Sequence, residues 1–222
     1  MNPPVLDQIA RLTLVPVLEI PDPAVAAPLA DALAAGGLPC AEVTFRTPAA
    51  AAAIEAMVKR RPELLVGAGT VLTVAQVDAA VGLGARFVVS PGFDRAVVER
   101  CVKLSVAVLP GVLTPSELQM ALGSGLDVAK LFPAEAAGGP AYIRALSAPF
   151  PGFRFVPSGG ITPHNLAGYL ELPQVIAVGG SWMAPRDLLV AGDFAGVERR
   201  VAEAVALVRR LRPLPAASGV PS

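Results

Sequence analysis

Lys130 is the side chain of this sequence whose surroundings best suit covalent chemistry. The 222-residue chain contains three lysines, and Lys130 lies in the apolar run Val128-Ala-Lys-Leu-Phe-Pro133. An ammonium group in such a run is largely removed from water, which favours the neutral amine that attacks carbonyl carbons to form Schiff bases. A buried ion pair, or a lysine that reaches solvent from a strand end, would also explain this position. Lys130 is therefore the candidate nucleophile.

Glu42 and Arg46 form a second group of candidate residues. Glu42 lies in the otherwise uncharged run Cys40-Ala-Glu-Val-Thr-Phe45, and Arg46 follows that run. A buried glutamate beside an amine can carry the protons that Schiff-base chemistry moves. The arginine fork can bind a substrate carboxylate through two hydrogen bonds. The alternatives are structural: Glu42 as an ion-pair partner of Arg46 or Lys130, and Arg46 in a salt bridge of its own loop.

Two glycine pairs indicate a binding site for an anion. They occur in Ser158-Gly159-Gly160 and in Gly179-Gly180-Ser181, and each follows or ends a predicted strand. Glycine lets backbone N–H groups approach a phosphate closely, and Ser181 adds a hydroxyl donor. A single glycine pair is common in turns, so the presence of two such segments is what favours the site. Further candidates at predicted strand ends are Thr70 in Gly67-Ala-Gly69-Thr70, Pro91 in Ser90-Pro91-Gly92, and Phe132.

The composition excludes several other chemistries. The chain has one histidine, His164, and two cysteines, Cys40 and Cys101. It therefore cannot build a multi-histidine zinc site, and it has no Cys-x-x-Cys motif. A Ser-His-Asp triad would have to use His164, which we expect to face solvent from the start of a helix. Both cysteines are expected to be buried free thiols of a reducing compartment.

The charge balance limits the partners of the protein. Eighteen basic and 18 acidic residues give a formal net charge of zero, so neither nucleic acid nor an anionic membrane is expected as a main partner. The N-terminal residues lack the basic and apolar regions of a signal peptide. The longest uncharged stretch, residues 155–170, is broken by proline and glycine and is too short to span a membrane. A soluble, cytoplasmic protein is expected.

Short β-branched runs alternate with alanine-rich runs of helical spacing along the chain. The strands are predicted at residues 14–20, 40–44, 64–66, 87–90, 107–109, 128–132, 154–157 and 175–178. The helices are predicted at residues 23–35, 48–60, 74–83, 95–104, 115–122, 142–147, 163–170 and 194–211. Three Thr-Pro pairs, beginning at Thr47, Thr114 and Thr162, predict N-caps with proline at the first helical position.

This alternation predicts an α/β fold, a single (β/α)8 barrel with a short N-terminal helix before residue 12. Near-continuous apolar strands are typical of a parallel sheet that is buried on both faces. A doubly wound open sheet is the alternative, but the first strand runs into Glu19-Ile-Pro21 rather than into a glycine-rich turn. The barrel is expected to occupy residues 1–211. The composition of residues 212–222 predicts a disordered tail.

Six segments of the chain resemble the bacterial 2-keto-3-deoxy-6-phosphogluconate (KDPG) aldolases and their relatives that act on 4-hydroxy-2-oxoglutarate (KHG). The resemblance runs in order over residues 14–211, and the combination is far more specific than any one segment. Two minor departures, Leu131 and Ser158, concern substrate preference rather than activity. The segments are Glu42-Val-Thr-Phe-Arg46-Thr47, Val66-Gly-Ala-Gly-Thr-Val71, Ser90-Pro-Gly92, Lys130-Leu-Phe-Pro-Ala-Glu135, Pro157-Ser-Gly-Gly160 and Gly179-Gly-Ser-Trp182.

The resemblance implies a class I aldolase without metal or organic cofactor, usually a homotrimer, whose partners are pyruvate and a 2-keto-3-deoxy sugar acid phosphate. In this family the matching lysine forms the Schiff base and the matching glutamate moves protons, which implies these roles for Lys130 and Glu42. Carboxylate binding falls to Arg46 and Thr70, and Pro91 and Phe132 are expected in the substrate site. The residues implied in phosphate binding are Gly159, Gly160, Gly179, Gly180 and Ser181.

Other functions are consistent with parts of this pattern. A KHG aldolase, or an enzyme with both activities, would use the same lysine on a substrate whose second anion is a carboxylate. A phosphate-binding isomerase or epimerase would need an acid/base pair and no lysine nucleophile. A sugar-phosphate sensor would bind without turnover. Covalent trapping of pyruvate on Lys130 separates the aldolases from the other two classes.

Overall fold

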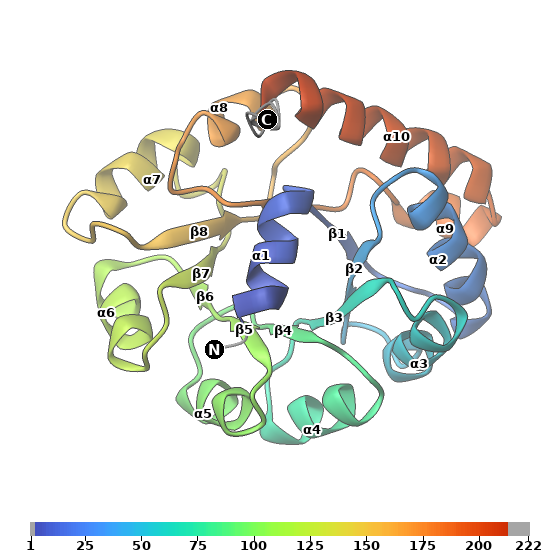
Figure 1. Ribbon diagram of the computed structural model, residues 1–222, viewed down its shortest axis with the longest axis horizontal. Helices are drawn as coiled ribbons and strands as arrows, with labels where there is room; N and C mark the ends of the chain where they lie inside the picture. The colour runs from blue at the N-terminus through green and yellow to red at the C-terminus, as the bar shows by residue number, and fades with distance from the viewer. Residues whose placement is uncertain (1–2, 213–222) are drawn as a thin grey trace, which may run out of the picture.

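The strands lie side by side at the centre of the computed structural model, and the helices surround them (Figure 1). The structure describes residues 3–212. The strands are β1 (Leu14–Leu18), β2 (Cys40–Thr44), β3 (Leu65–Gly69), β4 (Phe87–Val89), β5 (Ala107–Leu109), β6 (Gly111–Val112), β7 (Val128–Leu131), β8 (Arg154–Pro157) and β9 (Val178–Gly180).

All the paired strands run parallel, as the apolar strand sequences predict. Six of them form a curved sheet in the order β5-β4-β3-β2-β1-β9, and β6-β7-β8 form a second sheet. One residue, Pro110, separates β5 from β6, and its carbonyl accepts a hydrogen bond from the Lys130 N–H. On the other side, isolated bridges pair Phe155 with Val175 and Ser158 with Gly179. The fold is thus an α/β fold built on parallel strands, with backbone contacts at both edges of the two sheets.

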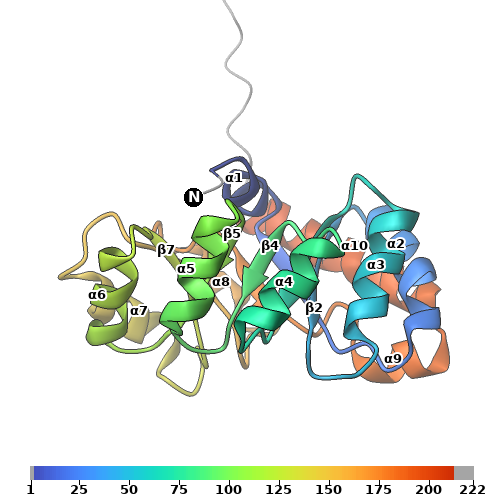
Figure 2. The same cartoon turned by 90° about the horizontal axis from the view of Figure 1, so that it is seen from below.

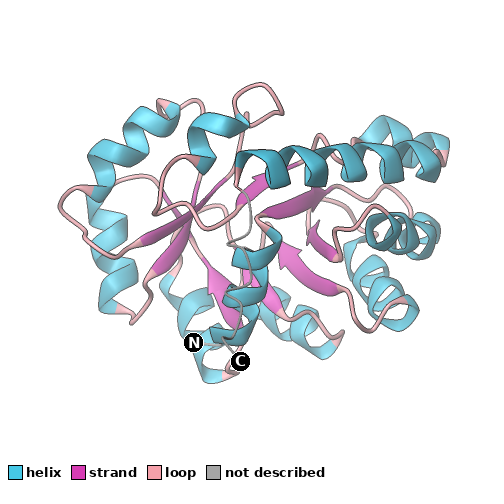
Figure 3. Cartoon of the chain, turned by 45° about the horizontal axis from the view of Figure 1, so that its top comes forward, coloured by secondary structure: helices cyan, strands magenta, loops and turns pink. Residues whose placement is uncertain are grey.

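Apart from α1, which precedes β1, the helices lie between successive strands or after the last strand and form a ring around the sheets (Figure 3). They are α1 (Pro3–Leu12), the 3-10 helix η1 (Pro23–Val25), α2 (Ala26–Ala35), α3 (Ala50–Arg60), α4 (Val74–Gly82), α5 (Arg95–Lys103), α6 (Pro115–Gly123), α7 (Gly139–Ser147), α8 (Leu166–Leu170), α9 (Arg186–Ala191) and α10 (Phe194–Leu211). Every predicted helix has a counterpart, and α9 is an additional element.

Two of the three predicted Thr-Pro caps are wrong. Thr114 caps α6 as predicted, and its capping box with Glu117 satisfies free N–H groups of the first turn. Thr47 instead donates its hydroxyl to the carbonyl of Ile20, and α3 starts later, at Ala50. Thr162 lies in a turn, where its N–H bonds to the side chain of Asn165, and α8 starts at Leu166. A hydroxyl can bond locally or across the fold, and tertiary contacts decide which occurs.

The last strand is shifted from its predicted position at residues 175–178. The structure places β9 at Val178–Gly180, where Val15 of β1 is in register with Gly179. Glycine weakens a strand by propensity, so the sequence favours the valine-rich residues before it. In the fold the glycines are needed, since a Cβ at Gly180 would overlap the ring of Trp182 and one at Gly179 would crowd the side chain of Ser158.

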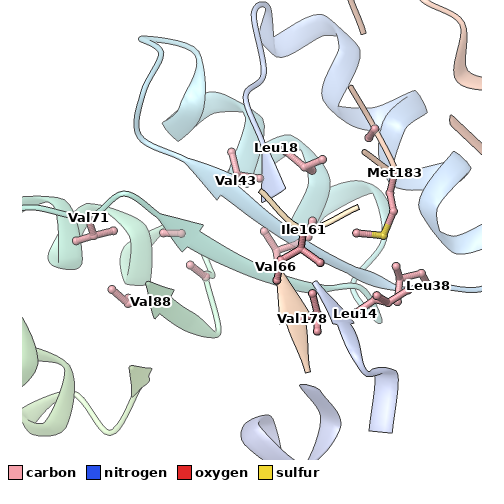
Figure 4. Close-up of a cluster of buried hydrophobic side chains, with 14 of the residues drawn as sticks. Leu14, Leu18, Leu38, Val43, Val66, Val71, Val88, Ile161, Val178 and Met183 are labelled. Carbon is pink, nitrogen blue, oxygen red and sulfur yellow. The ribbon is translucent and has the colours of Figure 1, made fainter. Parts of the chain in front are cut away.

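Two hydrophobic clusters hold the layers together. The larger one fills the space between the strands and the surrounding helices, and Figure 4 shows part of it, including Leu14, Leu18, Val43, Val66 and Val178. The smaller one lies among the strands and is covered by α1, which crosses one end of the sheets in Figures 1 and 2. Because α1 closes that end, the loops that follow the strands' carboxyl ends are left to form the opposite face.

The C-terminal prediction is partly outside the described residues. Residues 213–222, most of the expected tail, are not described, whereas Arg212 is. Its guanidinium donates hydrogen bonds to the carbonyls of Leu170, Leu172 and Val175, so it is tied to the segment between α8 and β9. Within residues 3–212, no helix has the length and apolar character that a membrane crossing requires.

Candidate active site

Lys130 and Glu42 meet in the interior of the sheets, although 88 residues separate them in the sequence. Lys130 belongs to β7 and Glu42 to β2, and the Lys130 Nζ lies 3.4 Å from the Glu42 Oε1. Lys130 is 7% exposed and Glu42 is 3% exposed. The ring of Phe132 lies beside them, with its centroid 5.2 Å from Nζ. The structure therefore joins an amine and a carboxylate in a dry setting, where one can pass a proton to the other.

Lys130 opens onto a cavity of about 580 Å³ at the carboxyl ends of the strands. This cavity unites candidates that come from strands far apart in the sequence. Glu42 is not among the lining residues and reaches the cavity through its contact with Lys130. The predicted site residues that line it are Arg46, Thr70, Pro91, Lys130, Phe132, Gly159, Gly160, Gly179, Gly180 and Ser181.

The end of β3 shows why glycine stands beside the buried carboxylate. A Cβ at Gly69 would occupy the space of the Glu42 carboxylate, so only glycine lets β2 and β3 approach with Glu42 between them. The next residue, Thr70, has a φ of 55°, in the left-handed region that non-glycine residues seldom adopt. That backbone turn brings Thr70 to the cavity wall.

The glycines after β8 turn the backbone toward the cavity. Gly159 and Gly160 have φ values of 98° and 80°, which favour glycine. A Cβ at Gly160 would also collide with the side chain of Glu135. Since no side chain covers these positions, the backbone itself forms this part of the cavity wall, next to Ser181. Such a wall suits an anion that accepts hydrogen bonds from N–H and hydroxyl groups.

Arg46 lies at the cavity edge and forms a salt bridge, with a residue of the loop after β1 rather than of its own loop. Its Nη1 lies 3.5 Å from the Oε2 of Glu19, and the Arg46 side chain is 49% exposed. Glu19 also lies 3.3 Å from the Nε of Arg186. Glu19 and Arg186 line the cavity, and sequence reasoning missed both. The strand predicted over residues 14–20 includes Glu19, whereas β1 ends at Leu18, and Arg186 belongs to the unpredicted helix α9.

The structure agrees with the expectations that His164 faces solvent and that both cysteines, Cys40 and Cys101, are buried free thiols. His164 lies in the turn before α8. Glu135 accepts a hydrogen bond from the hydroxyl of Tyr169. Trp182 packs against Gly180 rather than lying among the cavity residues. Across residues 3–212 there is no cluster of three or more His, Cys, Asp or Glu side chains arranged to hold a metal ion.

The family model for KDPG and KHG aldolases matches residues 5–200. The chain belongs to this aldolase family. A 2-dehydro-3-deoxy-phosphogluconate aldolase of Treponema pallidum is 47% identical over 87% of this chain and 92% of its own. The KHG/KDPG aldolase of Escherichia coli strain K12 is 42% identical over 86% of this chain and 90% of its own.

A solved structure links the family to covalent chemistry on pyruvate. The KDPG aldolase of Legionella pneumophila is 40% identical, covers 90% of this chain and 97% of its own, and has a TM-score of 0.87. It holds pyruvate as a covalent carbinolamine intermediate. A carbinolamine forms when an amine adds to a carbonyl group, which is the reaction that the Lys130 amine was predicted to perform. The resemblance stated from the sequence is confirmed.

Proposed function

We propose that this aldolase cleaves 2-dehydro-3-deoxy-6-phosphogluconate (KDPG) to pyruvate and D-glyceraldehyde 3-phosphate through a Schiff base on Lys130. The observation that carries the proposal is the buried contact of 3.4 Å between Lys130 Nζ and Glu42 Oε1 beside a cavity. Lys130 supplies the nucleophile, and Glu42 is placed to move the protons that each step gains or releases.

The reaction begins with attack of the Lys130 amine on the C2 ketone. The new C–N bond gives a carbinolamine, whose hydroxyl leaves as water after Glu42 delivers a proton directly or through a water molecule. The resulting iminium withdraws electrons from C3 and C4. Because the buried pair lies at the cavity wall, proton transfer and covalent chemistry occur at one place.

Cleavage follows from the electron demand of the iminium. Glu42 takes the proton of the C4 hydroxyl, the C3–C4 bond breaks, and its electron pair forms an enamine while the aldehyde leaves. Protonation of the enamine at C3 regenerates an iminium, and water then hydrolyses it to pyruvate and the free amine of Lys130. Neither an oxidant nor a reductant is needed. The iminium serves as the electron sink, so we propose that turnover needs no metal or organic cofactor and persists in EDTA.

The cavity residues are proposed to hold the two anionic ends of the substrate apart. Arg46 and Thr70 bind the carboxylate next to the reacting ketone, and positioning of this kind lowers the entropic barrier to attack. Pro91 and Phe132 form apolar walls. The backbone donors at the far end are proposed to hold the phosphate, and they belong to Gly159, Gly160, Gly179, Gly180 and Ser181.

KHG is a second candidate substrate, since relatives of this chain include an aldolase named for both substrates. Serine and backbone donors that bind phosphate can also bind a carboxylate. Steady-state kcat/KM values for KDPG and KHG measure the preference directly. We expect the higher value for KDPG, and equal values would contradict the assignment of KDPG as the principal substrate.

Replacement of Lys130 tests the proposed function. Lys130→Ala removes the nucleophile and is expected to abolish pyruvate production from KDPG. Lys103→Ala provides the matched control, because Lys103 is exposed on α5. Turnover by Lys130→Ala at the wild-type rate would exclude the Schiff-base mechanism, and a wild-type protein that bound KDPG without cleaving it would be a sensor.

We further propose how this aldolase is organised. The backbone contacts at Pro110 and at the Ser158–Gly179 bridge support closure of the two sheets into a (β/α)8 barrel over residues 1–211. Family membership supports a cytoplasmic homotrimer, and exposed apolar side chains such as Leu72, Val102 and Met120 are available for contacts between subunits. Light scattering during gel filtration tests the trimer, and a monomeric mass would exclude it.

A further inference from the structure

Three charged side chains form a continuous bridge along the cavity edge. Glu19 directs its Oε2 toward Arg46, at 3.5 Å, and its Oε1 toward Arg186, at 3.3 Å. The side chains of Glu19, Arg46 and Arg186 are 37%, 49% and 59% exposed. All three line the cavity that contains Lys130. We call Arg46, Glu19 and Arg186 the charged bridge.

The order of the strands explains this bridge. β1 pairs with β2 on one side and with β9 on the other. Glu19 directly follows β1, Arg46 follows β2, and Arg186 follows the loop after β9. Glu19 is therefore held between the proposed carboxylate-binding end of the cavity, at Arg46, and the proposed phosphate-binding end, near Gly180 and Ser181.

The charges of the cavity suit a ligand with two anionic ends. Its lining contains three cationic side chains, Arg46, Lys130 and Arg186, and one acidic side chain, Glu19. Glu19 would repel an anionic substrate if it were not paired with the arginines. Exposed ion pairs of this kind contribute little to stability. An arginine fork bonds phosphate through shorter, two-pronged hydrogen bonds, so a phosphate can replace Glu19 as the partner of Arg186.

We propose that Arg186 binds the phosphate of KDPG and sets the preference for KDPG over KHG, while Glu19 holds both arginines in place until substrate arrives. The inference rests on the proposed function. The phosphate of KDPG lies farther from the keto carbon than the second carboxylate of KHG does. Arg186 lies beyond Ser181 in the chain and at the exposed edge of the cavity. It therefore binds the phosphate of KDPG, the longer of the two substrates. Glu19 is then a positioning residue that acts through Arg46 and Arg186.

Steady-state kinetics on two substrates test this assignment. In Arg186→Ala, kcat/KM for KDPG is expected to fall about tenfold or more, through KM, since a charge-assisted bond to phosphate is lost. The value for KHG is expected to change much less. Arg186→Lys keeps the charge but not the fork and is expected to restore part of the loss. Glu19→Gln is expected to raise KM for KDPG with little change in kcat, because Arg46 and Arg186 lose the carboxylate that holds them in place.

Controls separate this inference from the proposed function. Arg154→Ala removes an ion-paired arginine at the start of β8, at the opposite end of the strands, and should alter neither substrate's KM. Wild-type protein that failed to cleave KDPG would overturn the proposed function itself. With wild-type cleavage established, equal losses on both substrates in Arg186→Ala, or no loss on either, would overturn the role of Arg186. A KM for KDPG in Glu19→Gln at or below the wild-type value would overturn the role of Glu19.

Discussion

Lys130 depends on one neighbour for every proton in the proposed reaction. The carboxylate of Glu42 lies 3.4 Å from its amine, and the residues around the pair leave both largely buried. Bulk water has limited access to such a pair, so proton transfer must use the carboxylate or a water molecule that it holds. The division of work between a nucleophilic amine and a proton carrier follows from this contact.

Glu42→Gln tests that division. The amide fills the same space but cannot take up the C4 proton, so kcat for KDPG is expected to fall by about 10²- to 10⁴-fold. Stopped assays of pyruvate release measure the change. Glu63→Gln, in an exposed ion pair with Arg61, is the control and should retain its activity. A kcat for Glu42→Gln close to the wild-type value would contradict the assigned role.

The two cysteines should be inert in the folded protein. Burial raises the pKa of the Cys101 thiol to about 12, and the nearby charge of Asp78 acts in the same direction. Burial also raises the pKa of Cys40. Both thiols are then protonated at pH 8, and the thiolate is the reactive form. Ellman's reagent at pH 8 should therefore detect no fast thiol before unfolding and two after it. Rapid reaction in the native state would refute this.

At the residue scale, the sequence identifies the residues of the proposed reaction and Arg46, but not Glu19 and Arg186 at the cavity edge. Lys130 and Glu42 stand out because each interrupts an apolar strand. Glu19 and Arg186 look like ordinary surface charges in the sequence. Their significance comes from the pairing of β1 with both β2 and β9, a long-range contact that no local pattern records.

At the scale of elements, strand and helix positions are predicted well where local signals act alone. β2, β5 and β8 have the predicted bounds, as does α10. The predicted bounds are wrong where a glycine or threonine makes a contact with a distant part of the fold. β3 extends to Gly69 because it pairs with β2 as far as Thr44, and glycine is needed there because a Cβ would collide with the Glu42 carboxylate. α3 starts after Thr47 because that hydroxyl bonds to Ile20.

Two of the Thr-Pro pairs allow a comparison of a threonine that caps a helix, Thr114, with one that does not, Thr162. Thr114→Ala removes the capping box of α6 and is expected to lower the free energy of unfolding by about 1 kcal/mol. Thr162→Ala removes a hydroxyl from a turn outside α8 and is expected to cost clearly less. Urea denaturation of the two variants measures both values. Equal losses of unfolding free energy in the two variants would show that the capping box stabilises the protein no more than the turn hydroxyl does.

At the scale of the molecule, α1 stabilises one end of the sheets, and the residues of the proposed reaction lie at the other end. The buried α1 residues Val5, Leu6 and Ile9 complete the cluster among the strands, whereas the cavity is lined by residues at and beyond the strands' carboxyl ends. The alternation of strands and helices in the sequence predicts this layered α/β architecture and the leading helix. Local patterns do not determine how the edges of the two sheets meet, since those contacts join Pro110 with Lys130 and Ser158 with Gly179.

Ile9→Ala should therefore weaken the fold without changing the chemistry. The side chain is fully buried, so its truncation is expected to cost about 2–5 kcal/mol. Each kcal/mol lowers the midpoint of thermal unfolding by about 2–4 °C in a chain of this size. Differential scanning calorimetry and kcat at 25 °C give the two readings. A large loss of kcat in a variant that remains folded would refute the separation.

The central claim is that Lys130 forms a covalent bond with the substrate's keto carbon. Incubation of the wild-type protein with pyruvate and sodium borohydride, followed by peptide mass spectrometry, tests it most directly. Reduction of the Schiff base should leave a stable adduct on the peptide that contains Lys130, and Lys130→Ala should show none. A wild-type protein without an adduct, or with the adduct on Lys59 or Lys103, would contradict the account.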